Sequence, residues 1–96
     1  MDKQILRQAN DNVKANDLDG LKKLVEYLPE YISREYMFKQ VFLTSCIHSQ
    51  SEIIEWMVGI YHTMDPVAQI GLRHTLTYGK YLIKNPGVRE WYTKLL

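Results

Sequence analysis

The side chains in this sequence that could bind a metal ion or act as a nucleophile or base include one cysteine and three histidines, Cys46, His48, His62 and His74. Cys46 and His48 are two residues apart, which places them on different faces of a helix, so they do not form a pair of metal ligands. The sequence contains no second cysteine and no two histidines four residues apart. We therefore expect no metal site and no cofactor, with the histidines exposed or structural and Cys46 as a small core residue.

Acidic residues form two close pairs, Asp17 with Asp19 and Glu52 with Glu55. Both pairs lie near expected helix starts, where the helix dipole stabilises acidic side chains, and this favours capping over acid–base catalysis. The sequence also lacks a glycine-rich phosphate-binding loop and a Ser-His-Asp arrangement. We predict that the protein is not an enzyme.

One group of basic residues stands out near the C-terminal end. Arg73, Lys80 and Lys84 occur at i, i+7 and i+11, Thr77 fills position i+4, and Tyr81 borders the group. If one helix continues through all of them, they form a single row on its surface. The row is either a plain solvated surface or the binding site of an acidic partner, such as an acidic protein segment or a nucleic-acid backbone.

Apolar residues recur with helical periodicity along nearly the whole sequence, which predicts an all-α fold of about six helices in three antiparallel hairpins. Several start and stop signals divide the chain between helices. These signals are Pro29 as a stop, and Ser33, Asn16 or Asp17, Ser49 with Glu52, Asp65-Pro66 and Asn85-Pro86 as starts. The fifth helix contains Gly71 and Gly79, each of which disfavours a helix interior by about 1 kcal/mol relative to alanine, so a break near Tyr78-Gly79 is an alternative.

The order of residue types in segment 16–25 returns 33 residues later in segment 49–58. Repeats of this length are typical of stacked helical units that bind other proteins. The echo predicts that corresponding apolar residues occupy equivalent environments. The expected pairs are Val13 with Cys46, Leu21 with Ile54, Leu24 with Met57, and Val25 with Val58.

The two echoed segments resemble the second half of an ankyrin repeat. Ser45-Cys46 stand at the paired alanines of that family, Ser49 at its turn glycine and Glu52 at its acid. The Thr-Pro-Leu-His start and the turn glycines of the family are absent, and segment 29–33 leaves little room for its β-hairpin fingers. The resemblance implies a short ankyrin-like solenoid that binds proteins through the face formed by the first helices of its hairpins. Another helix-hairpin solenoid and a compact six-helix bundle are the alternatives.

Length and charge complete the sequence-based expectations. The 96 residues fit a single helical repeat domain spanning 1–96, and the formal net charge of +1 gives no global attraction to nucleic acid or membrane. A lone cysteine and the lack of a signal-like or membrane-spanning apolar run favour a cytoplasmic protein. We expect another protein as partner. A nucleic acid bound by the basic row of the fifth helix is the alternative, and a homodimer is a third.

The aromatic residues divide into two expected groups. Trp56 and Trp91 occupy corresponding places in their units and are predicted to lie in the core. Tyr27, Tyr31 and Tyr36 flank the Pro29 turn, where they either pack over the turn or are exposed for binding.

Overall fold

The computed structural model describes residues 2–29 and 31–95. Within these ranges the regular structure consists of six α-helices and no strand, which confirms the all-α prediction. The helices are α1 (Asp2–Lys14), α2 (Leu18–Glu26), α3 (Arg34–Ile47), α4 (Ser51–Thr63), α5 (Pro66–Leu82) and α6 (Pro86–Leu95).

Four helices begin with the side-chain cap that their sequence predicts, in which a side-chain oxygen accepts a hydrogen bond from a backbone N–H one turn later. The caps are Asp17 to Gly20 (2.9 Å), Ser33 to Tyr36 (3.2 Å), Asp65 to Ala68 (2.9 Å) and Asn85 to Val88 (3.1 Å). Proline follows the cap of α5 directly, as expected from its missing N–H and fixed φ.

The predicted capping box of Ser49 and Glu52 is wrong. The N-cap of α4 is Gln50, which makes no side-chain capping bond. Ser49 lies one residue earlier with a φ of 52°, and its hydroxyl accepts a hydrogen bond from the backbone N–H of Asn85 at 3.3 Å. The serine therefore holds the loop before α6 instead of the start of α4.

α5 is continuous through Gly79, so the alternative of a break at this point does not occur. A Cβ atom at Gly79 would lie 2.6 Å from the Phe42 ring and 2.8 Å from Cys46 Sγ, so glycine is what lets α3 and α5 approach closely. Gly71, eight residues earlier on α5, lies near Glu35 of α3. Because both contacts advance in the same direction along the chain, the two helices run parallel.

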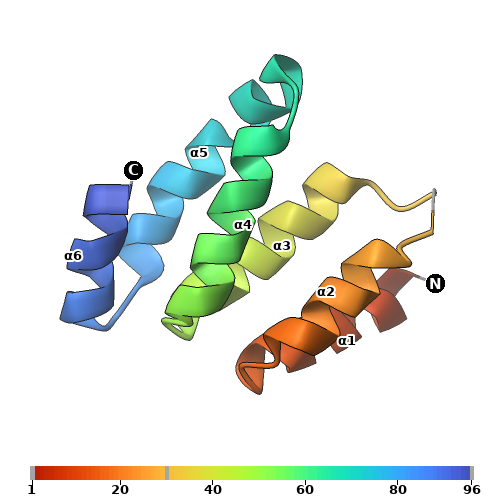
Figure 1. Cartoon of the computed structure of the whole chain (residues 1–96), viewed down its shortest axis with the longest axis horizontal. Helices are drawn as coiled ribbons and strands as arrows, with labels where there is room; N and C mark the ends of the chain where they lie inside the picture. Colours follow the sequence, from red (N-terminus) through yellow and green to blue (C-terminus); the bar gives the residue numbers. More distant parts are fainter. Residues whose placement is uncertain (1, 30, 96) are drawn as a thin grey trace.

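The helices form two layers (Figure 1). α3 packs against both α1 and α5, and each of these three helices also packs against the helix that follows it. α2 and α4 lie in front of α1 and α3 in the view of Figure 1. The shortest dimension of the Cα trace, 18 Å, matches two layers of helices packed about 8–10 Å apart.

The core is centred on Phe42 of α3. Its ring stacks on Phe38 with a centroid distance of 5.6 Å, and it tilts against Tyr92 of α6 at 6.1 Å. Tyr92 is fully buried, and its hydroxyl donates a 2.8 Å hydrogen bond to the carbonyl of Leu76 on α5. Burial raises the pKa of this phenol, because ionisation would place a charge in apolar surroundings. Aromatic contacts therefore join α3 to α6, and the Tyr92 hydrogen bond joins α6 to α5.

The turns before α2 and α4 have the same backbone geometry, 33 residues apart. Asn16 and Ser49 both adopt the left-handed conformation, with φ of 55° and 52°. Corresponding hydrogen bonds close both turns. They are Asn16 N to Val13 O (2.9 Å) with Ser49 N to Cys46 O (3.0 Å), and Asp17 N to Asn12 O (2.7 Å) with Gln50 N to Ser45 O (3.0 Å).

Corresponding apolar residues share an environment in two of the four expected pairs. All four members of the pairs Val13 with Cys46 and Leu21 with Ile54 have no exposed surface. The other two pairs differ, because Leu24 and Val25 of α2 are partly exposed whereas Met57 and Val58 of α4 are buried. α4 is flanked by more of the molecule than α2, which lies at one end of its layer (Figure 1).

Candidate functional site on the outer face of α3 and α5

α5 carries a second row of apolar residues on the side turned away from the core. Val67, Ile70, Tyr78 and Tyr81 are 79%, 66%, 55% and 70% exposed, and His74 lies between them. Their spacing of i, i+3, i+7, i+11 and i+14 places them along one stripe of the helix. The stripe extends along nearly the full length of α5 and has no covering element among the described residues.

α3, which runs parallel to α5 in the same layer, adds a shorter row with the same orientation. Tyr36 and Ile47 are 54% and 45% exposed, and Leu43 between them is partly exposed. We call the two rows together the outer face. It comprises Tyr36, Leu43, Ile47, Val67, Ile70, His74, Tyr78 and Tyr81.

The predicted basic row borders this face but is shorter than expected. Arg73, Thr77 and Lys80 follow one edge of the stripe on α5, and the Thr77 hydroxyl donates a 3.2 Å hydrogen bond to the Arg73 carbonyl. Tyr81 belongs to the stripe itself. Lys84 is not part of the helical row, because α5 ends at Leu82 and the chain then turns into an extended conformation.

Other predicted residues lie away from this face. Tyr27 and Tyr31 are exposed beside the Pro29 turn. Trp56 and Trp91 were predicted to lie in the core. Both pack against the core but remain partly exposed at its edge. Cys46 is fully buried, as predicted, and desolvation raises the pKa of its thiol to about 12, so at neutral pH it is a protonated core side chain.

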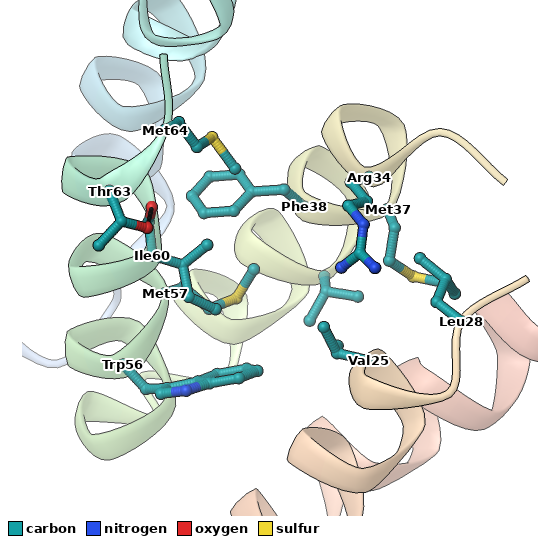
Figure 2. A pocket seen from close by; sticks show the side chains of 11 residues that line it. Val25, Leu28, Arg34, Met37, Phe38, Trp56, Met57, Ile60, Thr63 and Met64 are labelled. Atoms are coloured by element: carbon teal, nitrogen blue, oxygen red, sulfur yellow. Dashed lines mark hydrogen bonds between the residues drawn. The ribbon is translucent and has the colours of Figure 1, made fainter. Parts of the chain in front are cut away.

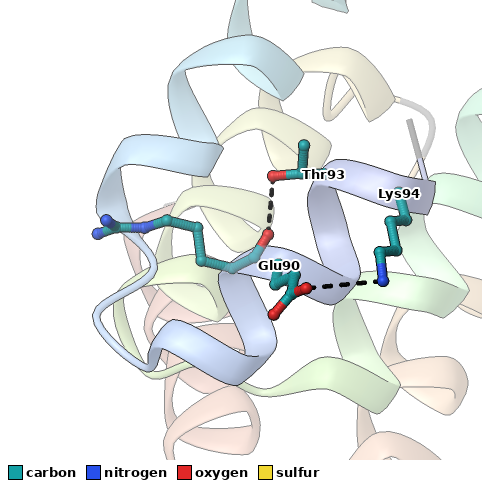
Figure 3. A network of polar contacts seen from close by, with 4 residues as sticks. Glu90, Thr93 and Lys94 are labelled. Carbon is teal, nitrogen blue, oxygen red and sulfur yellow. Dashed lines mark hydrogen bonds and ion pairs between the residues drawn. The ribbon is translucent and has the colours of Figure 1, made fainter.

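Charged and metal-binding clusters give no second candidate among the described residues, where no group of three His, Cys, Asp or Glu side chains is placed to hold a metal ion. The polar contacts on α6 are of a structural kind (Figure 3). Lys94 pairs with Glu90 at 3.6 Å, and the Thr93 hydroxyl donates to the Arg89 carbonyl at 2.9 Å. The Arg89 guanidinium donates to the Ile83 carbonyl at 3.0 and 2.6 Å, which holds the α5–α6 loop.

A groove lies on the other layer of the molecule, between α2 and α4, with α3 as its floor (Figure 2). Its volume is about 260 Å³. The groove is lined mainly by apolar side chains, and Trp56 forms part of one wall. Because Trp56 borders this groove, part of its side chain is accessible to solvent.

α5 has a buried apolar row as well as the exposed one, and the sequence-based expectations did not include the exposed one. Leu72 and Leu76 of α5, and Ile83 directly after it, carry the core contacts, with 3%, 5% and 0% exposure. Val67 and Ile70 lie three residues apart on the opposite side of the helix, and this second apolar row was the sequence signal that could have indicated an interaction face.

No known protein-family model, curated protein or solved structure matches this chain. Within residues 2–29 and 31–95, no helix has the length and apolarity required to cross a membrane.

Proposed function

We propose that this protein is a non-catalytic interaction module that binds a partner protein through the outer face of α3 and α5. The observation that carries the proposal is the exposed stripe of Val67, Ile70, Tyr78 and Tyr81. Isolated exposed apolar residues are common on monomeric proteins, but contiguous apolar patches mark interaction sites. Tyrosine strengthens the proposal, because it offers a large contact area at low entropic cost.

The charges beside the stripe favour an acidic partner. Arg73 and Lys80 flank one edge, and Lys39 is exposed on α3, whereas the acidic residues nearby are Glu35 and Asp65, the N-cap of α5. An amphipathic helix with an apolar row and flanking carboxylates would match both the stripe and its cationic edge. A second copy of this chain fits less well, because pairing α5 about a two-fold axis in antiparallel orientation brings the cationic edge against itself.

We also propose that the six helices form a short ankyrin-like stack of three hairpins. The equal turn geometry at Asn16 and Ser49 supports it, as does the row in which α1, α3 and α5 pack side by side. In that family the first helices contribute to the binding surface, and here the apolar residues of the outer face lie on two of the first helices, α3 and α5. The single, buried Cys46 agrees with a reducing compartment such as the cytoplasm.

Affinity capture with matched surface variants tests this function. Ile70→Glu and Tyr81→Glu each place a charge in the stripe, and we expect each to abolish the partner's capture while the protein remains folded. Tyr27→Glu is the matched control, because Tyr27 is as exposed as Tyr81 but lies at the end of α2. Capture that survives both stripe variants, or that is lost only with Tyr27→Glu, would contradict the proposal.

A further inference from the structure

The groove between α2 and α4 is rich in methionine and is separate from the outer face of α3 and α5. Three of the four methionines of the chain, Met37, Met57 and Met64, line it together with Phe38 and Trp56. Methionine is flexible and polarisable, so a methionine-rich wall adapts to apolar ligands of varied shape.

Arg34 is the single charged residue among the eleven that line the groove. It lies at the start of α3 and is exposed to solvent. Figure 2 shows its side chain turned inward, with the guanidinium directed toward the space between Met37 and Val25. A guanidinium beside an apolar cavity can bind a carboxylate through two parallel hydrogen bonds.

The size of the groove sets the size of a ligand that can fill it. At about 30 Å³ for each water-sized group, its 260 Å³ accommodate about nine such groups. A small ligand with a short apolar chain matches this volume.

We propose that this groove binds a small amphiphilic monocarboxylate of roughly eight carbons in total, with its carboxylate on Arg34 and its unbranched apolar chain against the methionines. A carboxylate matches the single positive charge of Arg34. A phosphate monoester carries about −1.5 to −2 charges at neutral pH and would leave excess negative charge in apolar surroundings. This site lies on the second layer of helices, so it does not depend on the outer face of α3 and α5.

The methionines provide the readout. In the full chain labelled with ¹³C-methyl methionine, titration with octanoate is expected to shift the Met37, Met57 and Met64 signals saturably. Octanol should bind roughly tenfold more weakly, because it lacks the charge-assisted hydrogen bonds. Hexanoate should bind about fourfold more weakly for each missing methylene, and acids longer than the groove should show no further gain.

Arg34→Gln is expected to remove the preference for octanoate over octanol while octanol binding persists. Arg7→Gln, on the exposed side of α1, is the matched control and should bind as the wild type does. Ile60→Phe, which fills the groove from α4, should weaken both ligands, and far-UV circular dichroism of each variant confirms its fold.

Three results would overturn the proposal. The first is an absence of methyl shifts at millimolar octanoate, and the second is equal affinity for octanoate and octanol in the wild type. The third is a set of shifts in the same methyl groups that depends on protein concentration without ligand, which would assign the groove to a second copy of the chain.

Discussion

Gly79 offers a direct test of how closely α3 and α5 pack. An added Cβ at this position would lie 2.6 Å from the Phe42 ring and 2.8 Å from Cys46 Sγ. Both neighbours are fully buried side chains of α3, so neither can turn away into solvent. Gly79→Ala must therefore separate α3 from α5 or displace the ring that links them to α6.

The magnitude follows from a comparison with Gly71 on the same helix. Replacing either glycine by alanine gains about 0.5–1 kcal/mol from lower backbone entropy in the unfolded chain. At Gly71 nothing opposes this gain, because the nearest atom, Glu35 Oε2, lies at an ordinary contact distance of 3.8 Å. At Gly79 overpacking opposes it by about 2–3 kcal/mol, the upper part of the usual range. We expect Gly79→Ala to be about 1–2.5 kcal/mol less stable than the wild type.

Urea and thermal unfolding of both variants measure the difference directly. The propensity gain cancels between them, so their free energies of unfolding should differ by about 2–3 kcal/mol. For a domain of this size that difference corresponds to roughly 10–20 °C in Tm. If Gly79→Ala raised the stability as much as Gly71→Ala, the close approach of α3 and α5 would be refuted.

Three further predictions concern the tryptophan, the thiol and the basic residues. Trp56→Ala should lower the free energy of unfolding by at most about 3 kcal/mol, the low end for a core aromatic, because Trp56 is partly exposed; an unchanged urea midpoint would contradict this. Stability should fall by about 1.4 kcal/mol between about pH 8 and about pH 10, because the unfolded chain releases the Cys46 proton near pH 9 while the native thiol, with a pKa of about 12, retains it. Cys46→Ala should remove this part of the pH dependence in urea titrations. Fluorescence anisotropy with mixed oligonucleotides should detect no micromolar binding at physiological salt; binding with a log–log salt slope of about −2 to −3, abolished by Lys80→Glu with Lys84→Glu, would favour the nucleic-acid alternative.

Local signals in the sequence were sufficient to predict most helix starts. Ser33, Asp65 and Asn85 each carry an oxygen that can satisfy a free N–H of the first turn, and the structure uses all three. The prediction failed at Ser49, whose hydroxyl is used by Asn85, a residue 36 positions away in the chain. A pattern of neighbouring residues cannot reveal a partner that only the folded chain brings close.

Gly79 is a second position at which a local sequence signal could not predict a contact between distant parts of the chain. Helix propensity made it a candidate break, because propensity considers a residue within its own helix. The packing of Phe42 against that position reverses the interpretation, since the missing side chain is the space that the neighbouring helix occupies. The groove was equally hidden, because its lining comes from three helices whose relative placement no local pattern specifies.

The two apolar rows of α5 have different consequences for the protein. Leu72 and Leu76 are buried and contribute to folding, whereas Val67 and Ile70 keep 79% and 66% of their surface in water and contribute little to it. A helix with apolar residues on two sides is normally covered on both. Within the part of the chain that the structure describes, only one side of α5 is covered, and the proposed interaction would cover the other. Under the proposed function, folding and binding therefore depend on different residues of the same helix, and substitutions in the stripe are expected to remove binding while the fold remains.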